Sequence, residues 1–179
     1  VLLLPSPVPR FALMADNGRQ AALWVSLAPL SAWGDADAWG LLDIRAGIPN
    51  VYNATADVFV PQMANLHLID GVSFNKGCYV GQEVVARMQY LGRLKRRMYV
   101  AEVESPVPPR PGDALDCALS RSDQGAGRVV DARPMGDGRY ALLAVIETAA
   151  AETGEVRLGP AGPLLHCQPP VYGFPEPAA

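Results

Sequence analysis

Cys78 is the residue whose type and surroundings most clearly suggest chemistry in this sequence. It lies in the run Lys-Gly-Cys-Tyr-Val-Gly-Gln-Glu, which covers residues 76–83. From Gly81 apolar residues recur at helical spacing, so a helix is predicted to begin there and to end at Gly92. Cys78 would then lie just ahead of a helix amino terminus, where free N–H groups favour an anion, and Lys76 adds a positive charge nearby. Because the thiolate is the reactive and metal-binding form of cysteine, this spacing predicts a reactive or ligating thiol.

A cysteine also packs well as a small apolar side chain, and this alternative stays open for Cys78. Cys117 and Cys167 lie in apolar, strand-like stretches, so packing is predicted for both. The three cysteines contain no C-x-x-C pair, which argues against a disulfide scaffold or a zinc ribbon. His67 and His166 have no second ligand at metal spacing, so no metal site is predicted.

The composition is that of a chain able to bury its own core. Of the 179 residues, 50% are hydrophobic, and the formal net charge is −3. This charge gives no general basic field, so direct binding of nucleic acid is not predicted. No apolar stretch approaches the length of a membrane span, and unpaired cysteines suit a reducing compartment, so we expect a cytoplasmic protein. The sequence does not begin with Met, and we expect it to be part of a longer protein.

The residues before Cys78 are predicted to form short strands and helices that must position it. The second helix has the clearest ends, because Asp35 or Asp37 can cap its start and Gly47 can end it. A turn is expected at residues 16–18, which read Asp-Asn-Gly. The predicted strands cover residues 11–15 and 58–60, and the predicted helices cover residues 19–27, 35–46 and 61–68.

After Arg97 the sequence changes to short alternating stretches separated by Gly, Pro and Asp-Gly turns. Such spacing is typical of a small β-barrel or sandwich. We therefore predict an α+β protein with two domains, residues 1–95 and a small antiparallel β-barrel in residues 96–179. The predicted strands of the barrel cover residues 98–103, 112–119, 127–132, 140–146, 155–158 and 162–168.

Two stretches of this sequence resemble a known family. They read Pro-Gln-Met-Ala-Asn-Leu at residues 61–66 and Gly-Val-Ser-Phe-Asn-Lys-Gly-Cys-Tyr-Val-Gly-Gln-Glu-Val-Val-Ala-Arg at residues 71–87. Both are similar to the signature of YgfZ-type proteins, folate-binding relatives of the glycine-cleavage aminomethyltransferase, or T-protein. A looser likeness includes residues 42–49 and the strands after Arg97. The resemblance implies that residues 1–95 form a partial T-protein-like, folate-binding domain.

The resemblance implies a cytoplasmic protein that binds tetrahydrofolate and supports the assembly or repair of iron–sulfur clusters. Through those clusters it would support enzymes that modify tRNA. Its partners would be iron–sulfur apoproteins or cluster-assembly factors. The family's key cysteine corresponds to Cys78, and Lys76 is assigned beside it as the second candidate catalytic residue.

The resemblance also suggests which residues bind the folate. Trp39 matches the family's folate-contacting tryptophan; the alternative is a helix-face tryptophan that fills the core. Gln62 and Asn65 are candidates to read a polar ring edge, or they satisfy backbone groups at a turn. Tyr79 and Arg87 complete the predicted cofactor-binding set.

A short run of positive charge follows the predicted helix. It could attract the glutamate tail of folate, a phosphate or RNA, and the alternative is a solvated entrance to the next strand. Its members are Arg87, Arg93, Lys95, Arg96 and Arg97.

Two departures from the family pattern limit what the resemblance implies. Arg45 stands where T-protein relatives often carry a glutamate that can hydrogen-bond the pterin. The family's amino-terminal domain, which supplies part of the folate site, is not expected in this chain. Iron–sulfur clusters usually need four thiolates, so Cys78 alone predicts no resident cluster or metal.

Three hypotheses therefore stand. The first is folate-dependent cluster maintenance through Cys78. The second is an enzyme, an aminomethyl or methyl transferase that uses tetrahydrofolate. The third is a non-catalytic module whose barrel docks cluster apoproteins.

Overall fold

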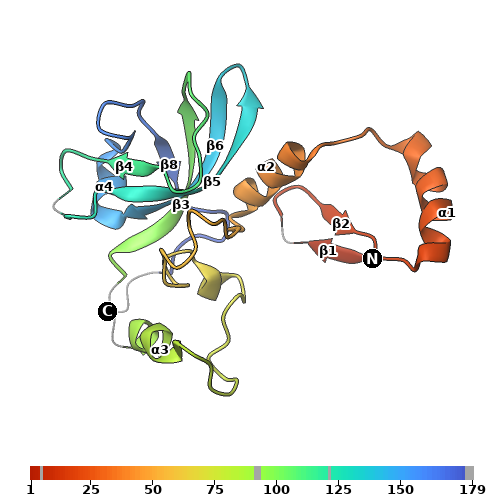
Figure 1. Cartoon of the computed structure of the whole chain (residues 1–179), viewed down its shortest axis with the longest axis horizontal. Helices are drawn as coiled ribbons and strands as arrows, with labels where there is room; N and C mark the ends of the chain where they lie inside the picture. Colours follow the sequence, from red (N-terminus) through yellow and green to blue (C-terminus); the bar gives the residue numbers. More distant parts are fainter. Residues whose placement is uncertain (5, 91–93, 121, 176–179) are drawn as a thin grey trace.

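The computed structural model describes residues 1–4, 6–90, 94–120 and 122–175, and within them the fold is α+β. Six strands form one antiparallel sheet in the order β7-β4-β5-β6-β3-β8 (Figure 1). They are β3 (Arg96–Glu104), β4 (Ala114–Asp116), β5 (Gly127–Gly136), β6 (Arg139–Glu147), β7 (Arg157–Leu158) and β8 (His166–Gln168).

Strand β6 lies near the middle of the sheet and is covered on both faces. Its residues 141–146 are all buried, and successive side chains alternate between two hydrophobic clusters. Leu142, Ala144 and Ile146 pack in one cluster, whereas Leu143 and Val145 pack in the other. A strand with core on both faces is a continuous apolar run, which is the pattern of this stretch.

The sheet is curled into an antiparallel half-barrel rather than lying flat (Figure 1). Register shifts in β5 at residues 129–131 and 134–136 fit this curl, because bulges bend a strand. The chain just before β8 also contacts the opposite edge, since Leu164 bridges Arg157 and the Leu165 N–H donates to the Val156 carbonyl at 2.8 Å. The α+β class and the antiparallel sheet are thus confirmed, and a complete barrel stays a prediction.

Helix α2 (Ala36–Ala46) packs against the sheet and confirms the helix predicted for residues 35–46. The Asp35 carboxylate caps its start by accepting from the Ala38 N–H at 2.7 Å. Gly47 ends it in the left-handed conformation, with φ of 69°. Ile44 is fully buried in the cluster that also contains Met98 of β3.

The first residues of the chain form β1 (Leu2–Leu4), β2 (Arg10–Ala12), α1 (Asn17–Leu27) and the 3-10 helix η1 (Ala28–Leu30). Strands β1 and β2 pair antiparallel, and α1 has no buried residue. These elements extend away from the sheet beyond α2 (Figure 1). The turn predicted at residues 16–18 is wrong, because Asp16 instead caps α1 by accepting from the Arg19 N–H at 3.0 Å.

The segment between α2 and the Cys78 motif differs most from the prediction. Residues 58–60 form no strand, and residues 61–68 form turns followed by the 3-10 helix η2 (Leu66–Leu68) instead of an α-helix. Asn65 has φ of 57°, a left-handed conformation that interrupts a regular helix. Helix α3 (Gln82–Tyr90) follows as predicted, and its expected continuation to Leu91 and Gly92 lies outside the described residues.

The second half of the chain contains one element that the sequence did not predict. Helix α4 (Thr148–Thr153) follows β6 directly. The strands expected at residues 112–119, 155–158 and 162–168 form, but they are shorter than predicted. Within the described residues, no helix is long and apolar enough to cross a membrane.

The hydrophobic core crosses the expected domain boundary. Strand β3 begins at Arg96, as the predicted boundary requires, yet one cluster combines Ile44 and Ala64 with Met98 and Val100. Residues from the two parts are therefore packed together, and the division into domains stays a prediction.

Candidate functional site

Cys78 lies in an irregular loop four residues before α3, and its side chain is exposed. The Tyr79 N–H donates to the Gln82 side-chain oxygen at 3.1 Å, and the Gln82 N–H donates to the Tyr79 carbonyl at 3.2 Å. This reciprocal pair ties the loop to the first turn of the helix. Gly81 between them has φ of 85°, which favours glycine and explains its place in the motif.

The other two cysteines are covered by the sheet. Cys117 is buried in a hydrophobic cluster, and Cys167 of β8 packs partly buried against the same cluster. Burial raises the pKa of the Cys167 thiol from 9.0 to about 11. The packing predicted for both is confirmed, and Cys78 is the exposed thiol of the three.

Gln62 and Asn65 are buried, and both donate hydrogen bonds that join separate segments. Gln62 Nε2 donates to the Val85 carbonyl of α3 at 2.6 Å. Asn65 Nδ2 donates to the Met98 carbonyl at 2.7 Å and contacts the Tyr172 hydroxyl at 3.2 Å. These bonds match the alternative in which the two amides satisfy backbone groups, whereas their predicted contact with a ligand stays a prediction.

Trp39 is exposed over 44% of its surface, so the interpretation of a core-filling tryptophan is wrong. The Arg10 guanidinium lies 4.9 Å from the centre of its ring. Arg10 is itself fixed by an ion pair with Asp43, one helical turn from Trp39, at 2.7 Å. The indole is thus supported by a cation and open to solvent over nearly half of its surface.

A polar network around Asp131 was not predicted. The Asp131 carboxylate is buried, with 1% of the residue exposed, and it accepts from the Tyr52 hydroxyl at 2.8 Å and from Asn50 Nδ2 at 3.3 Å. Arg133 donates to the Tyr52 hydroxyl at 2.7 Å and pairs with Asp37 of α2 at 2.9 Å. Burial, and then the neighbouring Asp131 carboxylate, raise the pKa of the Tyr52 hydroxyl.

This network fastens α2 to β5. Arg133 passes close over Gly40 of α2, where any Cβ would collide with its side chain. Sequence spacing contains no signal for the network, because its members lie as many as 96 positions apart. An aspartate within an apolar stretch and a glycine inside a predicted helix are the local hints that the sequence contains.

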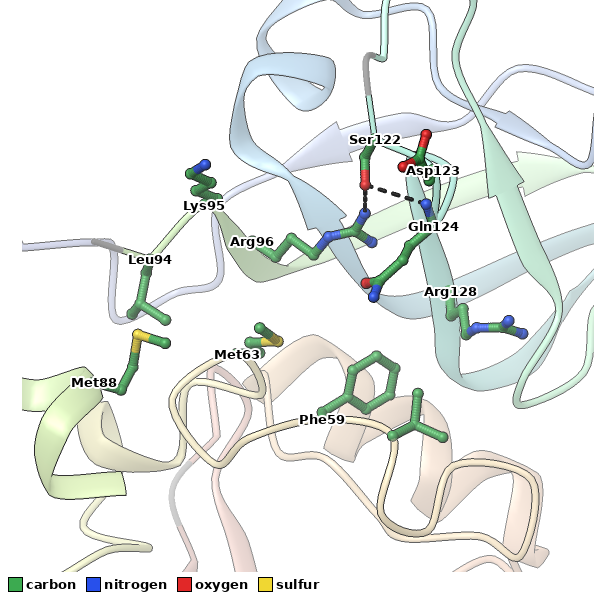
Figure 2. A pocket seen from close by; sticks show the side chains of 11 residues that line it. Phe59, Met63, Met88, Leu94, Lys95, Arg96, Ser122, Asp123, Gln124 and Arg128 are labelled. Atoms are coloured by element: carbon green, nitrogen blue, oxygen red, sulfur yellow. Dashed lines mark hydrogen bonds between the residues drawn. The ribbon is translucent and has the colours of Figure 1, made fainter. Parts of the chain in front are cut away.

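A cleft of about 740 Å³ lies between the loop segment of residues 58–63, helix α3 and the sheet (Figure 2). Apolar side chains form one side of the cleft. Polar and charged side chains of the sheet and of the loop between β4 and β5 form the other side. The cleft is lined by Val58, Phe59, Met63, Met88, Leu94, Lys95, Arg96, Ser122, Asp123, Gln124 and Arg128.

None of the seven predicted site residues lines this cleft. Its Met63 and Met88 are chain neighbours of Gln62 and Arg87, and Lys95 and Arg96 belong to the predicted basic cluster, whose Arg93 lies outside the described residues. Gln62 is hydrogen-bonded to α3, the helix that carries the exposed Arg87. Lys76 and Tyr79 lie in the same exposed loop as Cys78. Trp39 lies on α2.

The fold and the site together define an α+β protein in which one exposed thiol precedes a short helix beside a curled antiparallel sheet. No protein-family model matches the chain.

Individual relatives do match the chain. It is 36% identical over 178 residues to the tRNA-modifying protein YgfZ of Sodalis glossinidius, a match that covers 98% of this chain and 54% of that protein. It is 34% identical over 152 residues to the tRNA-modifying protein YgfZ of Yersinia pestis and to that of Yersinia pseudotuberculosis, covering 85% of this chain and 46% of each relative. The chain is therefore YgfZ-type, and it spans about half the length of the curated relatives that it matches.

Proposed function

We propose that this chain is part of a tetrahydrofolate-binding protein that supports iron–sulfur cluster assembly or repair, and through it the enzymes that modify tRNA. The observation that carries this proposal is the similarity of 98% of the chain to a protein named tRNA-modifying protein YgfZ. Because the chain spans about half of that relative, the activity and partners belong to the whole protein.

The exposure of Cys78 supports its role as the working thiol. A thiol acts on a partner or ligates a metal only where the partner can reach it, and Cys117 and Cys167 are covered by the fold. One thiolate is one ligand, whereas a cluster usually takes four. The contact of Cys78 with a cluster would therefore be shared with a client protein. Lys76, two residues away in the same exposed loop, would hold an anionic group beside it.

The surroundings of Trp39 support a role in folate binding. A half-exposed indole gives a planar surface on which a pterin or aminobenzoyl ring can stack. Arg10, paired with Asp43, holds the indole from one side and restricts its rotation. A side chain fixed before binding loses little conformational entropy when the ligand arrives.

Titration of the intact protein with tetrahydrofolate tests this assignment. Trp39→Ala is expected to weaken binding about tenfold, the size of one lost ring-stacking contact. Trp33→Ala is the matched control, because Trp33 is also an exposed tryptophan and contacts Trp24 rather than the α2 site. Equal affinities for the wild type and Trp39→Ala would remove Trp39 from the folate site.

A further inference from the structure

The cleft in Figure 2 has an apolar side suited to a planar ring. Phe59 and Met63 come from the loop segment, Met88 comes from α3, and Leu94 comes from the chain entering β3. Phe59 and Met63 pack against the buried cluster, so this side of the cleft is anchored in the core. Thioether and aromatic side chains make favourable contacts with aromatic rings, and methionine adapts its shape to them.

The opposite side of the cleft is positively charged. Arg96 is held in place because its Nη2 donates to Ser122 Oγ at 2.8 Å and to the Gly125 carbonyl at 2.7 Å. Arg128 adds a second cation, against one carboxylate from Asp123, whereas the Lys95 ammonium points away from the cleft (Figure 2). A guanidinium fixed by such bonds keeps its remaining N–H groups for an anion without having to be ordered on binding.

Size and charge together indicate the class of ligand. A cleft of about 740 Å³ falls in the range that holds small molecules and cofactors. A phosphate monoester carries a charge of about −1.5 to −2 and three acceptor oxygens, which matches the two guanidinium groups of Arg96 and Arg128. We propose that this cleft binds a nucleoside monophosphate, with its base against the methionines and Phe59 and its phosphate beside Arg96.

A single nucleotide fits the chain better than an extended strand. Positive charge is local to this cleft, since the chain as a whole has a net charge of −3. Gln124 lines the cleft, and its side-chain amide offers an NH2 donor group and a carbonyl acceptor that can read a base edge. This site is separate from the proposed folate contact, because Trp39 does not line the cleft.

Calorimetric titration of the intact protein with adenosine 5′-monophosphate tests the proposal. Adenosine and inorganic phosphate are each expected to bind at least tenfold more weakly, because each lacks half of the recognised groups. Arg128→Gln is expected to weaken binding of the monophosphate about fivefold, since this cation is exposed and its charge is partly screened.

Arg157→Gln is the matched control for Arg128→Gln. Both are exposed strand arginines whose Nη1 donates to a backbone carbonyl, of Gly162 in one case and of Gly112 in the other. Arg157→Gln is expected to bind like the wild type. Met88→Gln replaces a thioether by an amide of similar size. It is expected to weaken the binding of the monophosphate and of adenosine to the same extent, because both contain the base.

Four results would overturn the proposal. The first is no saturable binding of the monophosphate, and the second is equal weakening by Arg128→Gln and Arg157→Gln. The third is loss of monophosphate binding in Trp39→Ala together with full competition between the monophosphate and tetrahydrofolate, which would place both ligands at one site. The fourth is binding of a five-nucleotide RNA more than tenfold tighter than the monophosphate, which would mean that the cleft binds a strand instead of a single nucleotide. Failure of folate binding alone leaves these results unaffected.

Discussion

Removal of the Asp131 carboxylate tests whether the buried network holds α2 on the sheet. The carboxylate accepts from the Tyr52 hydroxyl, Asn50 Nδ2 and the Ala132 N–H, and it lies 3.4 Å from Arg133 Nε. Asp131→Ala leaves these donors without their acceptor in a site where 1% of the residue is exposed.

The magnitude follows from how many of these donors can turn to water. Asn50 is exposed and Tyr52 is half-buried, so both recover part of the loss. Arg133 Nε is buried and makes no hydrogen bond, so it loses only its ion pair with the carboxylate. An unsatisfied buried donor costs about 1–3 kcal/mol, and the sum for Asp131→Ala is about 3 kcal/mol. If the free energy of unfolding falls by about 2 kcal/mol per molar urea, the unfolding midpoint of Asp131→Ala should be roughly 1.5 M lower than that of the wild type.

Urea unfolding followed by circular dichroism measures this shift, and Glu102→Ala on β3 provides the control. Glu102 is an exposed carboxylate of the same sheet, so its removal should change stability by no more than about 0.5 kcal/mol. In a double-mutant cycle, Tyr52→Phe should couple to Asp131→Ala by about 1 kcal/mol. Strictly additive effects, or a midpoint for Asp131→Ala equal to that of Glu102→Ala, would refute the reasoning.

Three further predictions concern the thiols and α3. Ellman's reagent should modify Cys78 rapidly in the native protein and Cys117 and Cys167 only after denaturation; three equally fast thiols would contradict the burial of the other two. Because its folded pKa is raised to about 11, Cys167 contributes stability below pH 9 that is lost as the pH rises through 11. Urea midpoints at pH 8 and pH 10.5 should therefore differ less in Cys167→Ala than in the wild type, and an unchanged difference would exclude Cys167 as a cause. Gln62→Leu should speed hydrogen exchange in α3 about fivefold through loss of the bond to the Val85 carbonyl, and unchanged exchange would mean that this bond does not anchor the helix.

Local rules were sufficient where a segment's own residues determine its structure. Asp35 and Gly47 mark the ends of α2, and the structure uses both as caps. The alternation and turns after Arg97 predicted an antiparallel sheet, and each expected strand forms in whole or in part. The start of α3 was placed within one residue, at Gly81 instead of Gln82.

Local rules failed where distant residues determine the conformation. The segment around Asn65 has a helical pattern, yet its Asn65 side chain donates to the Met98 carbonyl, and the backbone takes a left-handed turn to reach it. The surroundings of Trp39 likewise depend on Arg10, which approaches its ring from a separate strand. Such pairings leave no periodic signal in the sequence.

The candidate site likewise has one part that the sequence predicts and one part that it does not. The motif around Cys78 was readable because its chemistry is local, and the structure exposes that thiol. The cleft of Figure 2 draws its walls from residues 58 to 128, so spacing alone could not assemble it. Folate binding, transferase activity and docking of apoproteins all stay predictions for the whole protein.

The central claim is that Cys78 is the working thiol of a protein that supports tRNA modification. The direct measurement uses bacterial cells that lack their own YgfZ-type protein, with cluster-dependent modified nucleosides quantified by mass spectrometry of digested tRNA. The intact protein and Cys117→Ala, the control at a buried thiol, should restore these nucleosides, whereas Cys78→Ser should not. Full restoration by Cys78→Ser would contradict the account.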